Sequence, residues 1–243
     1  MTEIYKTKGI ILKQQPFGEQ DRIIFAATPS YGKIKIISKN GFRRSAGAFG
    51  LFDAFAELEF ILERGRNFDR CSEVSLSKSY SAISSDYFSS VAASYFCEAV
   101  CWSVPFFGGN DRSYFLLCRL FDALERGEGI ALIPSGLYFI MKNSGHAPFT
   151  SACCECGSDE GLEFFSPSEG LVCGKCVSES CVYIGPEASL LIKAIPFVKT
   201  GELAEAFNKN VFIVAENALR KSFEFVFDRP ILSSEFLKSA DAV

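Results

Sequence analysis

The chain has 243 residues, of which 48% are hydrophobic and 22% are charged, and its formal net charge is −4. This balance is that of an ordinary globular protein with room for two or three domains, and a chain of this size with ten cysteines does not need a secreted disulfide scaffold. No stretch reaches the apolar length of a membrane span, and the first residues lack the apolar core of a signal peptide, so we expect a cytoplasmic protein without a membrane partner.

The acidic net charge on its face speaks against a nucleic-acid partner, but the charge is unevenly distributed. Residues 1–80 carry thirteen Lys and Arg against nine Asp and Glu, a balance of +4, whereas residues 81–243 carry twelve against twenty, a balance of −8. Positive charge is therefore confined to the N-terminal third of the chain.

That N-terminal third is predicted to form short strands separated by turn signals such as Pro16-Phe17-Gly18 and Arg64-Gly65-Arg66-Asn67. The strands are expected at residues 5–14, 21–28, 33–37, 54–63 and 71–79. Five short strands without a helix long enough for a βαβ crossover indicate a small barrel of the OB or SH3-like kind.

Alternation along two of these strands predicts which side chains are buried. In the third strand, Ile34 and Ile36 fall in the core and Lys33 and Lys35 on the opposite face. In the fourth strand the glutamates alternate with apolar residues and lie on the polar face, where a solvated role is the default. This set comprises Glu57, Glu59 and Glu63.

A basic loop joins the third and fourth strands. Arg43 and Arg44 are adjacent in it, and flexible residues surround them, so guanidinium groups can match phosphate oxygens while Phe42 stacks on a base. An ordinary solvated loop is the alternative. The nearby basic residues favour binding because they can form one positive face. The predicted nucleic-acid-binding residues are Lys33, Lys35, Lys39, Arg43, Arg44, Arg64 and Arg66.

After residue 80 the apolar residues recur at helical spacing. Helices are expected at residues 87–102, from an N-cap at Asp111 to Gly127, around 137–145, and at 186–197 and 210–227. Their aromatic stripes are typical of a core. The cysteines within these patterns read as small buried hydrophobic residues; they are Cys97, Cys101 and Cys118.

Two Cys-x-x-Cys pairs lie between the helices, and they predict a structural zinc site. Each pair forms a tight turn that offers two thiolates, and four thiolates close the coordination sphere. The predicted ligands are Cys153, Cys156, Cys173 and Cys176. A disulfide cluster or two accidental pairs are the alternatives. Cys154 and Cys181 are spare thiols that can substitute if the register differs, and His146 is interpreted as a loop residue.

These elements predict an α+β multidomain chain, an OB-fold barrel followed by a helical domain with an inserted zinc ribbon. The expected ranges are 1–80 for the barrel, 81–148 and 183–243 for the two parts of the helical domain, and 149–182 for the ribbon. No phosphate-cradling loop, dinucleotide fingerprint or nucleophile and base pair is present in the sequence, so we expect a binding protein and not an enzyme.

The whole pattern resembles the bacterial DNA repair protein RecO family. The resemblance covers nearly the whole chain in order, with the cysteine ribbon set between helices, and it also rests on Gly9-Ile10-Ile11-Leu12, Gly18-Glu19-Gln20-Asp21-Arg22, Gly32-Lys33, the loop from Lys39 to Arg44, and Arg64-Gly65-Arg66. It implies that the four paired cysteines are the zinc ligands of the family and that Arg43 and Arg44 belong to its basic loop.

The resemblance also implies a role. This is a non-enzymatic mediator of recombinational repair in the bacterial cytoplasm and nucleoid, which binds single- and double-stranded DNA and anneals complementary strands. Its implied partners are RecR and single-stranded-DNA-binding protein, with which it helps to load RecA. The acidic tail of single-stranded-DNA-binding protein is expected in a hydrophobic pocket among the C-terminal helices.

One feature departs from the family pattern, because Ser45-Ala46-Gly47 follows the arginine pair where further basic residues are usual. DNA binding is therefore expected to be weak and to fade with salt unless a partner such as RecR adds contacts. Two other hypotheses stay open. One is a zinc-ribbon and OB-fold protein that contacts RNA or a protein, and the other is a zinc enzyme in which Cys154, Cys181 or His146 leaves a coordination position open.

Overall fold

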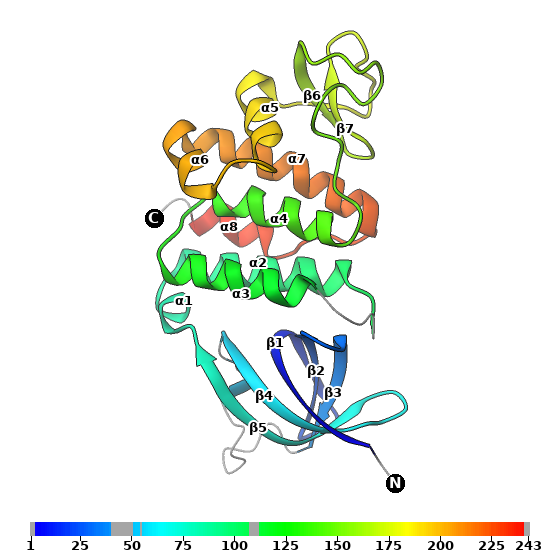
Figure 1. Ribbon diagram of the computed structural model, residues 1–243, viewed down its shortest axis with the longest axis vertical. Helices are drawn as coiled ribbons and strands as arrows, with labels where there is room; N and C mark the ends of the chain where they lie inside the picture. Colours follow the sequence, from blue (N-terminus) through cyan, green and yellow to red (C-terminus); the bar gives the residue numbers. More distant parts are fainter. Residues whose placement is uncertain (1–2, 40–50, 54, 107–111, 241–243) are drawn as a thin grey trace. The chain divides into compact units, whose positions relative to one another are not determined.

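The computed structural model describes residues 3–39, 51–53, 55–106 and 112–240, and the chain divides into two compact units (Figure 1). The first unit comprises residues 1–127 and 233–243, and the second comprises residues 128–232. Among the helices in the described ranges, none combines the length and the apolar character that crossing a membrane requires.

The first unit begins with a closed barrel of five strands. They are β1 (Ile4–Phe17), β2 (Asp21–Thr28), β3 (Gly32–Ser38), β4 (Ala56–Glu63) and β5 (Asp69–Ser79). Their order around the barrel is β1-β2-β3-β5-β4, and β4 pairs with β1 to close it. Neighbouring strands are antiparallel except β3 and β5, which pair in parallel. This order is that of a five-stranded OB-fold barrel, so the predicted fold is confirmed.

Alternate side chains of the strands fill the barrel. Ile34 and Ile36 are fully buried, as the alternation predicted, and they pack with Leu58, Phe60 and Leu62 of β4. Burial of each such side chain contributes about 1.5–3 kcal/mol, which makes the barrel a firm support for the turns at its ends.

Lys33 lies on the face of β3 opposite Ile34 and Ile36, as predicted, but its side chain is buried with 6% relative exposure. Its ammonium donates a hydrogen bond to the carbonyl oxygen of Cys101 and lies 4.4 Å from the ring centre of Phe106. Cys101 belongs to the last turn of a helix, where carbonyl groups lack helical partners and carry partial negative charge that attracts a cation. Lys33 therefore contributes no exposed cation to the positive face that the sequence predicted on this side of β3.

Within the described residues, the first unit also contains the 3-10 helix η1 (Leu51–Asp53) and four α-helices, namely α1 (Ser81–Ser85), α2 (Tyr87–Ser103), α3 (Arg112–Glu125) and α8 (Ser234–Ala240). The carboxylate of Asp86 caps α2 by accepting a hydrogen bond from the N–H of Ser89. The carboxylate of Glu98 accepts two hydrogen bonds from Ser233, just before α8, and so ties the end of the chain to α2. The short helices α1 and α8 were not predicted, and the predicted cap Asp111 lies outside the described residues.

The second unit is a group of helices with a small sheet. Its elements are α4 (Leu132–Asn143), β6 (Leu162–Ser166), β7 (Gly170–Cys173), β8 (Val182–Tyr183), α5 (Gly185–Ala194), α6 (Thr200–Ala206) and α7 (Lys209–Phe227). The strand order is β7-β6-β8, and α7 packs against both α4 and α5. The segment with the sheet thus leaves one group of helices and returns to it, as expected for an inserted ribbon. Helix α6 was not predicted.

Along the sequence, the boundary between the two compact units lies between α3 and α4. Helices α2 and α3 pack against β1, so they belong with the barrel, whereas α4 belongs with α7. The sequence had placed all of these helices in one interrupted domain. The predicted domain ranges 1–80, 81–148, 149–182 and 183–243 remain predictions.

Candidate nucleic-acid interface and metal centre

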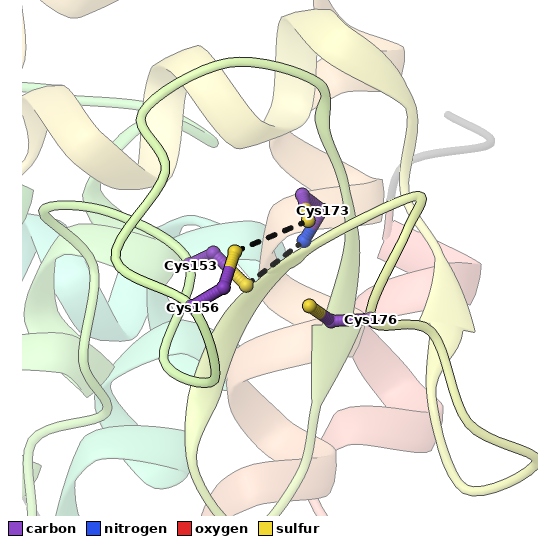
Figure 2. A group of neighbouring side chains, drawn as sticks. All are labelled: Cys153, Cys156, Cys173 and Cys176. Carbon is purple, nitrogen blue, oxygen red and sulfur yellow. Dashed lines mark hydrogen bonds between the residues drawn. The ribbon is translucent and has the colours of Figure 1, made fainter.

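Four cysteine thiols gather in the second unit (Figure 2). Cys153 and Cys156 lie in a turn before β6, Cys173 ends β7, and Cys176 lies in the turn that follows. Their sulfur atoms all lie within 4.8 Å of one another, and those of Cys156 and Cys173 are 3.7 Å apart. The two pairs therefore come together, as their spacing predicted.

Backbone hydrogen bonds hold each cysteine pair in a tight turn. The N–H of Gly157 donates to the carbonyl of Cys153 at 2.9 Å, and the N–H of Cys176 donates to the carbonyl of Cys173 at 3.0 Å. Gly157 has a φ of 74°, in the left-handed region that favours glycine. Local sequence thus fixes each pair, and the β6–β7 hairpin brings the second pair to the first.

The distances among the sulfur atoms fit a tetrahedral thiolate site. A metal with metal–sulfur bonds of about 2.3 Å places its sulfur ligands about 3.8 Å apart, which agrees with the 3.7 Å between Cys156 and Cys173. Cys153 and Cys173 are buried, whereas Cys156 is exposed. Such a group of four can hold a metal ion and leaves no coordination position for a substrate.

The thiols of this group differ in pKa. Burial raises the pKa of Cys153, but hydrogen bonds from the backbone N–H groups of Cys173, Cys156 and Glu155 outweigh burial and lower the pKa to about 6. Hydrogen bonds to Cys156 and Cys173 raise the pKa of Cys176 to about 12. A cation at the centre would favour the thiolate form of every member, because the thiolate is the form that binds metals.

Three residues that the sequence left open lie outside this group. Cys154 is half-buried, and burial raises the pKa of its thiol to about 11. Cys181 lies 3.3 Å from the hydroxyl of Ser178, and the ring of His146, in the loop after α4, packs 5.3 Å from the ring of Phe227. Within the described residues, the four paired cysteines are the group whose side chains can hold a metal.

Two of the predicted nucleic-acid-binding residues meet on the barrel of the first unit. Lys35 of β3 and Arg66 of the β4–β5 turn line a shallow pocket of about 410 Å³ with Asn67, Phe68 and Phe106. Arg66 is exposed and Lys35 is half-buried. Lys39 follows the end of β3 and is exposed.

Arg64 is held at the start of the same turn. Its guanidinium lies 4.4 Å from the ring centre of Tyr5 and 5.2 Å from that of Tyr31, and its Nε is 3.5 Å from the carboxylate of Glu3. Tyr5 in turn donates a hydrogen bond to Asp69. The pKa of Tyr5 is raised, mainly by burial and secondly by this hydrogen bond. The planar guanidinium is thus fixed in position and keeps 31% of its side chain exposed.

The remaining residues of the predicted nucleic-acid interface either lie outside the described part of the chain or are enclosed by other side chains. Arg43, Arg44 and the stacking candidate Phe42 lie outside the described residues. Lys33 is enclosed by helix α2 and Phe106, so its ammonium does not extend the positive face.

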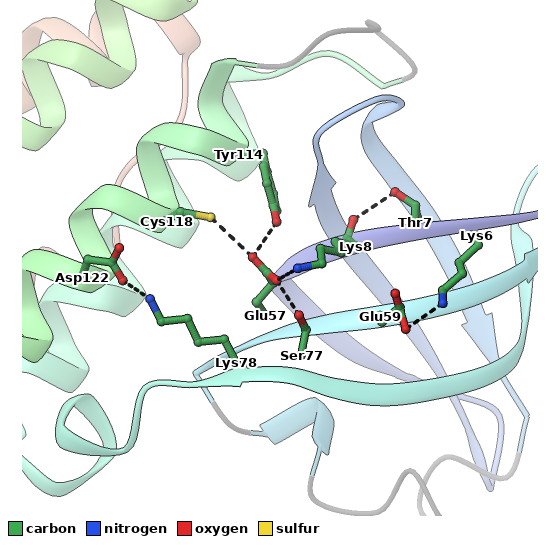
Figure 3. A network of polar contacts seen from close by, with 10 residues as sticks. All are labelled: Lys6, Thr7, Lys8, Glu57, Glu59, Ser77, Lys78, Tyr114, Cys118 and Asp122. Carbon is green, nitrogen blue, oxygen red and sulfur yellow. Dashed lines mark hydrogen bonds and ion pairs between the residues drawn. The ribbon is translucent and has the colours of Figure 1, made fainter.

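Glu57 of β4 is also buried, with 9% relative exposure, and it joins the barrel to α3 (Figure 3). Its Oε1 accepts hydrogen bonds from Lys8 at 2.7 Å and Ser77 at 2.6 Å, and its Oε2 accepts one from Tyr114 at 2.7 Å. The thiol of Cys118 makes a longer contact with Oε2, at 4.0 Å. Burial raises the pKa of Glu57, but these three bonds outweigh burial and leave the pKa below its usual value. The solvated role expected for Glu57 is therefore wrong.

Other lysines near this network are paired with carboxylates. Lys6 lies 2.9 Å from Glu59, and Lys78 of β5 lies 2.5 Å from Asp122 of α3. In contrast, three cations beside the shallow pocket or just after β3 have no carboxylate within ion-pair distance in the described part of the chain. These cations are Lys35, Lys39 and Arg66.

The sequence did not predict that Phe68 and Phe106 would join this basic region. Phe68 directly follows the Arg-Gly-Arg-Asn turn in the sequence, so its place beside the basic residues of that turn could have been predicted. Phe106 follows the end of α2 and returns to the barrel by a single parallel bridge with Lys33, which no spacing in the sequence indicates.

Comparisons with known proteins find relatives that align with most of the chain. The chain is 31% identical over 184 residues to the DNA repair protein RecO of Rubrobacter xylanophilus, an alignment that covers 73% of each chain. It is 29% identical to the RecO of Synechococcus sp. strain JA-3-3Ab, with 98% of this chain and 86% of the relative covered. It is 28% identical to that of Thermoanaerobacter sp. strain X514, with 90% and 89% covered.

Two family descriptions account for nearly all of the sequence. Residues 1–80, which contain the barrel, match the family described as Recombination protein O N terminal, and residues 84–234 match the one described as Recombination protein O C terminal. The chain therefore belongs to the recombination protein O family.

Proposed function

We propose that this protein is a non-enzymatic mediator of recombinational DNA repair that binds single- and double-stranded DNA and anneals complementary strands. It acts with RecR and single-stranded-DNA-binding protein and helps to load RecA. The relatives are named as DNA repair proteins, and the barrel has the OB fold, which is a common platform for nucleic acids.

The observation that carries this proposal is the group of unpaired cations beside β3 and the β4–β5 turn. Lys35, Lys39 and Arg66 have no carboxylate partner among the described residues, whereas Lys6 and Lys78 do. A phosphate backbone gains more from cations whose charge is not already neutralised. Arg64 at the same turn, and Arg43 and Arg44 of the basic loop, complete the proposed DNA-binding set.

Binding through these residues depends on salt. Each phosphate that a Lys or Arg neutralises contributes roughly 0.7 to the slope of log affinity against log salt for a single strand. The three unpaired cations among the described residues support weak binding that salt weakens further, and we expect RecR to add contacts.

The test is annealing of complementary oligonucleotides coated with the cognate single-stranded-DNA-binding protein, measured at low and moderate salt. We expect faster annealing that declines as salt rises. Lys35→Ala and Arg66→Ala should each slow annealing and reduce the salt slope of single-strand binding by roughly 0.7. The matched control is Lys6→Ala, which makes the same change in net charge at a lysine already paired with Glu59.

The basic loop is tested in the same assay. Arg43→Ala combined with Arg44→Ala should weaken binding to all DNA sequences alike, since phosphate contacts carry no sequence information. Unchanged binding would remove this loop from the proposed interface. No annealing by the wild-type protein, even with RecR present, would favour an RNA or protein partner instead.

The metal of the four-cysteine group is proposed to be one structural Zn²⁺. Four thiolates are the ligand set of structural zinc sites, and such sites contribute directly to folding. Metal analysis of the purified protein should find one zinc per chain. Cobalt substitution should give the absorption of a tetrahedral site with four thiolates, whereas a site that includes water would support a zinc enzyme.

A further inference from the structure

The shallow pocket beside β3 combines aromatic rings with cations in a way that ordinary phosphate binding does not require. Five of the described residues line its volume of about 410 Å³, which falls within the range of small-ligand pockets of about 300–1,000 Å³. These lining residues are Lys35, Arg66, Asn67, Phe68 and Phe106.

Residues of strands β1, β2 and β3 support the aromatic rings of this pocket. The backbone of Phe106 pairs with Lys33 of β3, whose buried ammonium lies 4.4 Å from the Phe106 ring centre. Phe25 of β2 lies 5.9 Å from Phe106, and Phe17 of β1 lies 6.3 Å from Phe68, measured between ring centres. The rings therefore rest on the barrel.

Lys35 lies among these rings. Its ammonium is 5.0 Å from the ring centre of Phe106, 5.2 Å from that of Phe68 and 5.6 Å from that of Phe25. The rings stabilise this cation, and no described carboxylate pairs with it. Its charge is thus placed at an apolar surface and stays available to an anion.

Exposure shows which groups a ligand can reach. Phe106 is 41% exposed although it is large and apolar, and Arg66 and Asn67 are exposed at the rim. The pocket therefore offers a ring face, two cations, and an amide that both donates and accepts hydrogen bonds. A ligand that matches all of these has a flat aromatic group joined to an anion, with polar atoms at the edge of the ring.

We propose that this pocket takes one unpaired nucleobase of a single strand, stacked on Phe106 or Phe68, with the adjoining phosphate between Lys35 and Arg66. This inference rests on the proposed function and adds to it a contact that a duplex cannot make, because paired and stacked bases do not present their faces. The pocket thus gives the barrel a preference for single strands that does not depend on sequence, since every base has a ring face.

The first test needs no variant. Full-length protein is titrated with a thymine oligonucleotide and with an abasic oligonucleotide of equal length and charge, at one low salt concentration. Because stacking of one base changes affinity by roughly 5- to 150-fold, we expect the thymine strand to bind more tightly by a factor in this range. Equal affinity for the two strands would overturn the inference.

The second test compares Phe68→Leu and Phe106→Leu with the control Phe225→Leu, which changes an exposed phenylalanine of α7. Leucine retains apolar bulk, so the barrel should keep its folding transition. The variant of the ring on which the base stacks should lose roughly 3- to 10-fold in affinity for the thymine strand, and both pocket variants should bind the abasic strand and a duplex as the wild type does. An equal loss for duplex and single strand would contradict the inference.

The outcomes separate the inference from the proposed function. If the wild type binds no DNA, the proposed function fails. If the wild type binds thymine and abasic strands alike while Lys35→Ala and Arg66→Ala weaken both, the function stands and the base pocket is refuted. Binding of an acidic aromatic peptide in place of the thymine strand would likewise refute it.

Discussion

The buried carboxylate of Glu57 permits a quantitative test of how α3 is attached to the barrel. Glu57→Gln keeps the size of the side chain but replaces one acceptor oxygen by an NH₂ donor. Lys8 and Ser77 donate to Oε1, and Tyr114 donates to Oε2, so at least one donor must face the new NH₂ group in either orientation of the amide.

The magnitude follows from the exposure of the three donors. Tyr114 is 3% exposed and cannot turn to water, so loss of its acceptor costs about 1–3 kcal/mol. A weaker bond from Ser77 adds about 1 kcal/mol. The side chain of Lys8 is 50% exposed, so its ion pair adds at most about 1 kcal/mol. The free energy of unfolding should therefore fall by about 2–5 kcal/mol.

The assay is urea unfolding monitored by tryptophan fluorescence. Trp102 is the single tryptophan of the chain and lies in α2, in the same compact unit as Glu57, so its signal reports the unfolding of that unit. The matched control is Glu59→Gln, which removes a carboxylate that is 35% exposed and paired with Lys6. We expect the control to change stability by no more than about 1 kcal/mol.

A double-mutant cycle then identifies the contact responsible. Tyr114→Phe removes the donor, so it should cost less in the Glu57→Gln background than in the wild type, with a coupling energy of at least about 1 kcal/mol. If Glu57→Gln changes stability by less than about 0.5 kcal/mol and the two substitutions are additive, the network does not attach α3 to the barrel as argued.

Three further predictions concern acid, metal and a buried lysine. The pKa of Glu57 in the folded state lies below its usual value of 4.5, so its contribution to the free energy of unfolding should be complete above that pH and should be lost as the pH falls through the folded pKa. The free energies of unfolding of the wild type and Glu57→Gln should therefore converge in acid and differ by a constant amount near neutral pH. Cys173→Ser, or removal of the proposed Zn²⁺ by a chelator, should abolish amide-exchange protection in β6 and β7 while leaving the Trp102 unfolding transition of the first unit unchanged. Lys33→Met should lower the free energy of unfolding by about 1–3 kcal/mol, because the hydrogen bond to Cys101 is lost, and should leave the salt slope of DNA binding unchanged. Lys35→Ala should instead lower the salt slope and barely alter stability.

The cysteine group could be predicted from the sequence because its geometry is local. Each Cys-x-x-Cys pair closes its own turn through a backbone hydrogen bond, and Gly157 allows the first turn by adopting a positive φ. Only the meeting of the two turns needed a longer contact, and the short β6–β7 hairpin supplies it. The strands of the barrel were predictable for the same reason, since alternation is a property of neighbouring residues.

Lys33 and Glu57 show where that reasoning stops. Alternation gives the face of the strand on which a side chain lies, and both residues do point away from the barrel core. It does not tell which helix later covers that face. The C-terminal turn of α2 covers Lys33, which was expected on a positive face, and α3 covers Glu57, which was expected in water, with Tyr114. Both residues are therefore buried hydrogen-bonding groups.

The same two helices determine which cations of the barrel remain for a ligand. The partner of Lys78 is a carboxylate of α3, and Lys8 is paired with the Glu57 that α3 encloses. A charge that has an opposite charge within 3 Å has little field at a distance, and physiological salt screens the remainder over about 8 Å. Lys35 and Arg66 keep their field because no described carboxylate meets them. The net charge of the chain is therefore a poor guide to its ligand, and the pairing of individual cations supports an approach of DNA from the side of β3 and the β4–β5 turn.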